Sequence, residues 1–303
     1  GFARLHTPST VRSVVARPSV RERRLARELR GLRTSVGWHG KDVAARLGWS
    51  AAKVSRIETG RTGVGADDLD RLLQLYRVPG RHAEQLRRLV PRTRPRGWWD
   101  AYADTLSAGY ANLIRLEAGS PALRCWSAVV PHPLLQTADY ARQVILSTWE
   151  PPSAADVDRR VQVCVRRREV LDGRDGDPLQ LSAVVDESVL HRRPVPGDGA
   201  DPRAVMRGQL ERLLAVGERP NVVVRVLPFD AGLPPVTSGS FAVLDSPVAA
   251  GPDVVYLESK TRIFFLDGDA EVAWYAAAHE HIAGMALSPE ESRDVLGAAL
   301  SRT

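Results

Sequence analysis

The chain's 303 residues are 44% hydrophobic and 26% charged, which is typical of a soluble globular protein with one large domain or two. Residues 1–97 hold 22 Lys and Arg against 8 Asp and Glu, whereas the remainder holds 20 against 28, so the net charge of +6 combines a basic N-terminal third with an acidic remainder. This asymmetry points to a polyanionic partner, and DNA or RNA is a better candidate than an anionic membrane surface. No apolar stretch reaches the roughly 18 residues of a membrane span or resembles a signal peptide.

The first part of the chain reads as helical. Residues 1–18 mix Arg, Ser, Thr and Pro without periodicity, which predicts a disordered basic arm. From residue 20, apolar residues recur at helical spacing until Gly37. Further short helices are predicted at about 40–47, 51–58, 66–75 and 81–92. Because Pro and Arg alternate beyond them, we expect an all-α domain over 19–93 and a linker at 94–97.

The remaining residues, 98–303, mix helical and extended patterns. Helices are predicted at 98–116, 137–148, 155–172 and 202–215, with two more at the end, the last one capped by Ser288-Pro289-Glu290-Glu291. Strands are predicted at 122–130, 178–185, 221–227, 240–244, 253–257 and 262–266, the last three as a meander. The predicted fold class is α+β: an all-α five-helix helix-turn-helix domain followed by a larger mixed α+β domain.

Residues 41–60 carry the helix-turn-helix pattern. Apolar residues three or four apart give both short helices a stripe toward a shared core: Val43, Leu47, Val54 and Ile57. Gly48 permits the positive φ that a short turn requires, and Ser50 is a good N-cap for the second helix. The second helix is therefore predicted to dock in the DNA major groove.

The side chains near the start and on the outer face of that helix are the predicted DNA contacts. Arg56 can grip guanine O6 and N7 bidentately, and Lys53 can read a base or hold a phosphate. Lys41, Arg61 and the arginines of the first helix would supply backbone attraction that depends on salt. The predicted DNA-binding residues are Lys41, Ser50, Ala51, Ala52, Lys53, Arg56 and Arg61.

The string from Lys53 to Gly60 resembles the recognition helix of the Xre-type repressor family, and the resemblance covers about residues 20–78. It implies that Arg33, near the end of the first helix, pairs with Glu58 after the recognition helix. Two features depart from the family. Gly40 stands where a phosphate-touching glutamine is common, and Ala51 and Ala52 stand where polar readers are common. Base readout would then depend on Lys53 and Arg56.

Several strings beyond residue 97 are similar, in the same order, to the C-terminal domain of actinobacterial WhiJ-like regulators: residues 131–140, 209–214, 220–232, 239–241 and 254–258. The resemblance implies an antitoxin-like C-terminal domain that senses a partner protein or a small ligand and tunes DNA binding.

Enzymatic and metal-binding interpretations find little support in the residues. Asp186-Glu187 followed by His191 is better explained by a strand that ends in a capped helix. His279-Glu280-His281 lacks the zincin spacing, and Cys125 and Cys164 show no metal-ligand spacing. We therefore predict no catalytic residues, no metal and no cofactor.

The predicted function is a cytoplasmic, sequence-specific transcriptional regulator that binds double-stranded DNA as a homodimer, because one short recognition helix reads too few bases. Its predicted partners are DNA, a second copy, and a small protein encoded nearby or a small-molecule effector, with no membrane. One alternative is an antitoxin-like protein that mainly binds a small partner protein. Another is a regulator-derived enzyme acting on a small metabolite.

Overall fold

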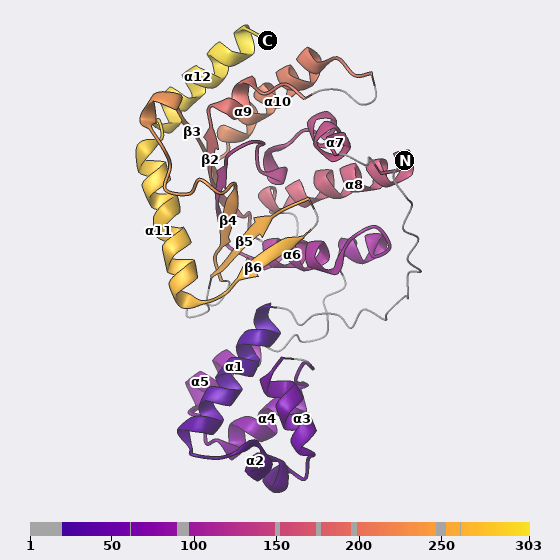
Figure 1. Cartoon of the computed structure of the whole chain (residues 1–303), viewed down its shortest axis with the longest axis vertical. Helices are drawn as coiled ribbons and strands as arrows, with labels where there is room; N and C mark the ends of the chain where they lie inside the picture. Colours follow the sequence, from indigo (N-terminus) through magenta and orange to yellow (C-terminus); the bar gives the residue numbers. More distant parts are fainter. Residues whose placement is uncertain are drawn as a thin grey trace, which may run out of the picture. The chain divides into compact units, whose positions relative to one another are not determined.

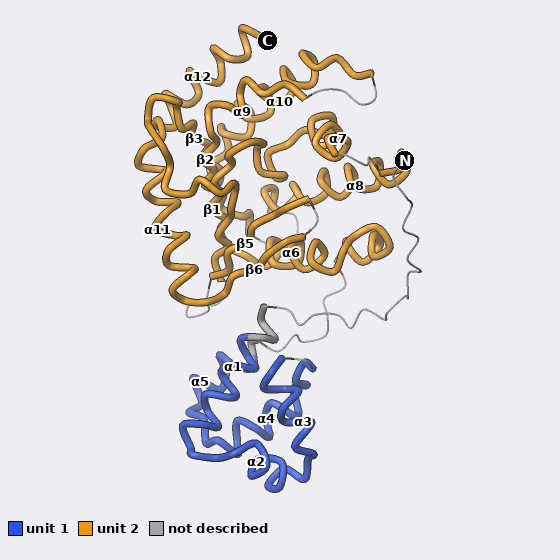
Figure 2. Tube along the Cα trace, in the orientation of Figure 1, with its two compact units in different colours: residues 1–94 blue, residues 95–303 orange. Residues whose placement is uncertain are grey.

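A computed structural model places the chain in two compact units, residues 1–94 and residues 95–303, which we call the head and the body (Figure 2). The structure describes residues 20–60, 62–89, 97–148, 152–173, 177–194, 199–246, 253–260 and 262–303. The predicted basic arm at 1–18 and residues 94–96 of the predicted linker lie outside the described residues.

The head is a bundle of five helices (Figure 1), as the apolar spacing predicts. They are α1 (Val20–Ser35), α2 (Gly40–Leu47), α3 (Ala51–Glu58), α4 (Ala66–Leu75) and α5 (Gly80–Leu89). Their apolar stripes meet in one core that includes Leu29, Val43, Val54, Leu69 and Leu86. The helices α2 to α5 have only 8 to 10 residues and would be unstable alone in water, so this shared core holds them in place.

The body is built on a six-stranded mixed sheet with the strand order β3-β2-β1-β4-β5-β6. The strands are β1 (Ala122–Ser127), β2 (Gln180–Asp186), β3 (Val222–Leu227), β4 (Phe241–Leu244), β5 (Val254–Glu258) and β6 (Ile263–Leu266). The first three strands are parallel, and the last three form the predicted antiparallel meander, whose first strand, β4, pairs with β1.

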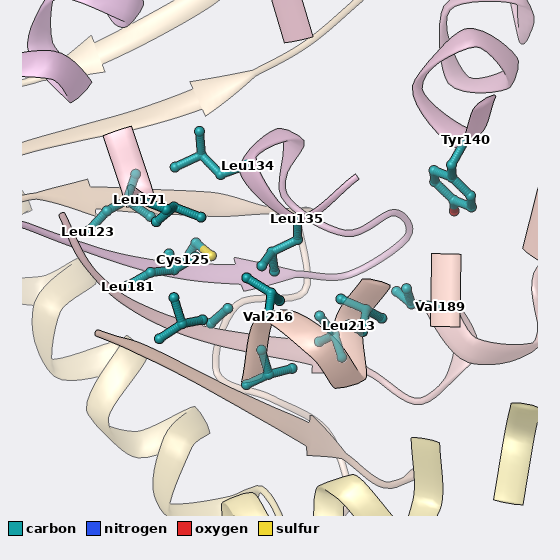
Figure 3. Packing of buried hydrophobic residues seen from close by; sticks show 14 of the residues in the cluster. Leu123, Cys125, Leu134, Leu135, Tyr140, Leu171, Leu181, Val189, Leu213 and Val216 are labelled. Carbon is teal, nitrogen blue, oxygen red and sulfur yellow. The ribbon is translucent and has the colours of Figure 1, made fainter. Parts of the chain in front are cut away.

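Both faces of this sheet are buried. Successive strand residues fall alternately into two apolar clusters, Cys125, Ala183 and Ala242 in the first and Trp126, Val184 and Val243 in the second. Figure 3 shows the first cluster, where side chains from β1, η2 and α10 meet. The second cluster packs against α11, which lies on the other side of the sheet (Figure 1). The body is therefore a three-layer α+β domain.

Helices make up the two outer layers of the body. They are η1 (Trp98–Tyr102), α6 (Ala108–Gly119), η2 (Pro133–Leu135), α7 (Ala138–Leu146), α8 (Ala154–Arg167), η3 (Arg168–Leu171), α9 (Ser188–His191), α10 (Pro202–Gly217), η4 (Phe229–Ala231), α11 (Asp269–Met285) and α12 (Pro289–Ser301). The predicted capping box of the last helix is present, since Ser288 Oγ accepts from the Glu291 amide at 3.2 Å and Glu291 Oε2 accepts from the Ser288 amide at 2.9 Å.

Two predicted elements of the body are wrong in extent. The single helix predicted over 98–116 is η1 followed by α6, because Ser107 caps a new helix by accepting from the Tyr110 amide at 3.2 Å. The strand predicted over 122–130 ends at Ser127, because the next amide, that of Ala128, donates to Ser240 Oγ instead of continuing a ladder. No helix among the described residues is long and apolar enough to cross a membrane.

Candidate nucleic-acid interface

The turn between α2 and α3 has the geometry that its sequence predicts. Gly48 adopts φ 68° and ψ 32°, a left-handed conformation that costs other residues about 1–2 kcal/mol. The next amide, that of Trp49, donates back to the Ala44 carbonyl at 2.8 Å. Ser50 then caps α3 by accepting from the Lys53 amide at 3.1 Å. These bonds fix the direction in which α3 leaves the turn.

One face of α3 is buried and the other is exposed. Val54 and Ile57 face the head core, which fixes the rotation of the helix about its axis. The opposite stripe is exposed and consists of Ala51, Ala52, Ser55, Arg56 and Thr59. Ser55 and Thr59 were not among the predicted contacts, although their spacing from Ala52 and Arg56 places them on the same face.

Arg56 is the one long cation on this exposed stripe. Its side chain makes no hydrogen bond or ion pair with the residues that the structure describes, so its five N–H donors are available to a ligand. Its backbone carbonyl, in contrast, accepts from the Thr62 amide at 3.2 Å and so ties the following loop to the helix. The guanidinium therefore projects from a backbone that is held at both ends of α3.

Lys53 lies at the side of the stripe and already has partners. Its ammonium forms an ion pair with Asp68 of α4 at 2.8 Å and lies 4.0 Å from the ring centre of Trp49. The two charged side chains remain 36% and 30% exposed, so the pair is a solvated one. A phosphate or base that binds Lys53 must displace Asp68. The sequence does not predict this ion pair, because Asp68 lies on a different helix.

The predicted pair of Arg33 and Glu58 is bidentate in the structure. Arg33 Nε and Nη2 donate to the two Glu58 oxygens at 2.7 and 3.0 Å, and Nη1 donates to the Trp38 carbonyl at 2.6 Å. The hydrogen bond to Glu58 raises the pKa of Arg33, so the guanidinium stays charged. The pair thereby ties the end of α1, the loop before α2 and the end of α3 together.

Tyr76, at the end of α4, packs beside this ion pair. Burial, followed by the charge of Glu58, raises the pKa of Tyr76, and its hydroxyl is buried without a hydrogen-bond partner among the described residues. Its ring centre lies 6.3 Å from that of Trp38. The ion pair is therefore covered by aromatic side chains on the side of the core.

A further predicted contact belongs to the start of α2. Lys41 is exposed in the first turn of α2, next to Gly40. Arg46, which was not predicted, stacks on Trp38 at 4.2 Å from the ring centre and is also exposed. Arg61 lies outside the described residues. Lys41 and Arg46 add exposed positive charge to the first helix of the motif.

Two acidic residues of the body, Asp186 and Glu187, accept hydrogen bonds from backbone amides. Asp186 Oδ1 accepts from the Ser188 amide and Glu187 Oε2 from the Phe229 amide, both at 2.9 Å, while Glu187 Oε1 lies 3.5 Å from His191 Nε2. Across the described ranges, no three His, Cys, Asp or Glu side chains gather so that they could hold a metal ion. These contacts support a structural role at the ends of β2 and β3.

A network of hydrogen-bonded polar side chains is buried inside the body. Arg167 donates to Glu117 through Nε at 2.9 Å and Nη2 at 2.6 Å, and through Nη1 to the Tyr110 hydroxyl. Tyr256 bonds His132 Nε2 and donates to Glu117 at 3.4 Å. Burial, followed by the charge of Arg167, lowers the pKa of His132 to about 3, so this histidine is neutral in the folded protein.

The capped turn, the buried stripe of α3 and its exposed opposite face make the head a helix-turn-helix domain, the class of domain that places a helix in a DNA groove. Residues 24–86 match a family described as a helix-turn-helix domain. Residues 110–298, more than half of the chain, match the domain of unknown function DUF5753, and the chain belongs to this family. No curated protein and no solved structure matches the chain significantly.

Proposed function

We propose that the protein is a sequence-specific transcriptional regulator of the Xre type, in which α3 docks in the major groove of double-stranded DNA. The observation that carries this proposal is the unpaired, exposed Arg56 on a helix whose opposite face is buried. A rigidly oriented guanidinium loses little conformational freedom when it reads a guanine edge. The exposed Lys41, Arg46 and paired Lys53 would hold the phosphate backbone around it.

The reading surface is narrow, which favours a homodimer on a two-fold site. Apart from Arg56, the exposed stripe of α3 offers two alanines, a serine and a threonine, and Thr59 already donates its hydroxyl to the Ser55 carbonyl at 2.7 Å. Ala51 and Ala52 can contact only apolar groups such as a thymine methyl. Two copies spaced one turn of DNA apart would double the number of bases read.

We assign a sensing role to the body and no catalytic activity. The resemblance of its strings to WhiJ-like regulators supports a domain that senses a partner protein or a small ligand. The carboxylates of Asp186 and Glu187 support the second half of the assignment, since both already accept backbone hydrogen bonds. In this proposal, binding at the body alters the affinity of the head for DNA.

The proposal is tested by replacing Arg56, the side chain expected to contact the bases. Sites are first selected by the full-length protein from a random duplex library, and binding of wild type and Arg56→Ala is then compared on the selected site and on single-base variants of it. Arg56→Ala should lose about 1–3 kcal/mol of discrimination, mainly at one guanine of each half-site. The selected site should be a two-fold repeat.

The matched control is Arg81→Ala. Arg81 is exposed on α5, which packs mainly on α1 and α4, so the charge change is the same at a different place. It should weaken all sequences by the same small factor. The proposal is wrong if Arg56→Ala and Arg81→Ala have equal effects on base preference, or if no sequence is enriched.

Exposed apolar side chains on the body favour a second function, that of an antitoxin-like protein which mainly binds a small partner. Phe229 and Leu233, near the carboxyl end of β3, are 63% and 85% exposed. Such side chains are common at protein interfaces. A stable complex with a small protein encoded next to this one, lost on Phe229→Ser together with Leu233→Ser, would support this function.

A further inference from the structure

Three arginines gather on the body around the short helices η2 and η3. Arg168, in η3, donates through Nη1 to the Gln136 carbonyl at 2.8 Å, directly after η2. Arg219, just after α10, donates through Nη1 to Asp172 Oδ1 at 2.6 Å, directly after η3. Both guanidinium groups are therefore held near the junction of these two segments.

Arg212, the third arginine, reaches the same place from α10. One turn earlier, Gln209 donates to the Leu135 carbonyl and accepts from the Thr137 amide, both at 2.9 Å. These bonds fix the face of α10 that lies against the residues following η2. Arg219 comes seven residues after Arg212, which places both on one side of the helix axis.

The positive charge at this place is only partly compensated. The Nε of Arg212 is buried without a hydrogen-bond partner, and neither Arg212 nor Arg168 forms an ion pair with the residues described. Burial, then the charges of Arg168 and Arg219, lower the pKa of Arg212, and Asp172 is the carboxylate that acts in the opposite direction. Among the residues that the structure describes here, three guanidinium groups thus share the carboxylate of Asp172, which is itself 34% exposed.

This accumulation contrasts with the charge of the rest of the body. Residues 98–303 carry 28 acidic against 20 basic side chains. Half-buried arginines that repel one another cost stability unless an anion joins them. The guanidinium fork matches the oxygens of a phosphate group in spacing and direction.

We propose that Arg168, Arg212 and Arg219 form a binding site for the phosphate group of a small phosphorylated ligand. This site would bind the ligand that the body senses in the proposed function. Only the biological role of the site rests on that proposed function. A small ligand is favoured over duplex DNA because the surrounding acidic body repels an extended polyanion.

The first experiment measures thermal unfolding of the full-length protein by calorimetry in sodium phosphate, in sodium pyrophosphate and in sodium chloride of equal ionic strength. We expect either phosphate salt at about 10 mM to raise the midpoint of the body's transition by about 3 °C or more. Arg212→Gln should abolish this rise. In chloride alone it should melt no lower than wild type, because it removes a repelled charge.

Arg207→Gln is the matched control, since Arg207 is exposed on the same helix and makes no ion pair with described residues. It should keep the full rise. Asp172→Asn is the second variant and removes the carboxylate that competes for Arg219, so it should bind phosphate several-fold more tightly at low salt.

The proposal is overturned if wild type shows no phosphate-specific rise, or if Arg212→Gln retains it. It is also overturned if Arg212→Gln weakens binding to duplex DNA while phosphate salts have no effect, which would assign the arginines to the DNA backbone. Unchanged DNA affinity of Arg212→Gln is expected. A failed phosphate test leaves the Arg56 test of DNA reading untouched, so the two proposals fail separately.

Discussion

The head and the body each contain a bidentate arginine–glutamate pair, and the surroundings of the two pairs differ. In the head, the side chains of Arg33 and Glu58 are 13% and 9% exposed, and the spare donor of the arginine goes to a backbone carbonyl. In the body, Arg167 and Glu117 are 0% and 1% exposed, and the spare donor goes to the Tyr110 hydroxyl. The same ion pair ties elements together near water in one unit and lies inside an apolar core in the other.

The difference shows how the two units use charge. The pair in the head leaves Arg56, Lys41 and Arg46 exposed on the outside of the motif, where a polyanion can reach them. The pair in the body neutralises a charge that water cannot reach, at a position where an unpaired ion would cost several kcal/mol. Loss of one partner should therefore destabilise the body far more than the head.

The largest effect is expected for Arg167→Met, which leaves Glu117 buried without its cation. The body should lose about 3–5 kcal/mol of unfolding free energy. Urea unfolding followed by circular dichroism measures this loss. Arg160→Met, an exposed change on the same helix α8, should change stability by less than about 0.5 kcal/mol. Adding Glu117→Met to Arg167→Met should restore much of the stability, and failure to do so would show that the pair is not the cause.

A smaller loss is expected for Arg33→Met in the head. Three hydrogen bonds to a partly exposed arginine disappear, which should lower the stability of the head by about 1.5–3 kcal/mol. The head's own transition in calorimetry reports the change. Arg30→Met, one turn earlier on the exposed face of α1, is the matched control. Equal losses for the two variants would contradict the comparison.

The pH dependence of the body comes next, because its effect is smaller when it is counted for a single unit of pH. His132, with a pKa near 3 in the folded protein, stays neutral while the unfolded chain protonates it below about pH 6.5. Protons then favour the unfolded state, so stability falls by about 1.4 kcal/mol for each unit of pH between 6.5 and 4. Burial also lowers the pKa of His279, which acts in the same direction. His132→Gln should flatten this slope, and an unchanged slope would remove His132 from the explanation.

The smallest effect is expected for Asp68→Asn, which releases Lys53 from its exposed ion pair. The stability of the head should change by less than about 1 kcal/mol. Affinity for DNA should rise by about two- to five-fold at low salt, because a competing carboxylate is gone and Lys53 can meet a phosphate. Glu84→Gln, an exposed change of equal charge on α5, should raise the affinity less. The reverse order would show that Asp68 does not restrain Lys53.

Local sequence determined most of the head. Apolar residues three and four apart, a glycine at the turn and a serine cap predict the limits of α2 and α3, because each of these features acts within one or two helical turns. The contact of Arg33 with Glu58 was predicted from resemblance to a known family and not from local rules. The ion pair of Lys53 with Asp68 carries no such signal, since it joins two helices whose packing sets their distance.

In the body, sequence alone determined the presence of helices and strands. Tertiary structure decided how the strands pair and which charged side chains meet. The β-branched run at 222–227 predicts a strand, but only the sheet order reveals that this strand is parallel to β2. Arg167 lies in a run of three arginines that looks like a solvated helix face, yet it is fully buried against Glu117, fifty residues away. Arg168, Arg212 and Arg219 likewise come together only because η3 and α10 pack on the same segment. Periodicity reports which side of an element is apolar, whereas the meeting of charges depends on packing between distant elements, which no local pattern records.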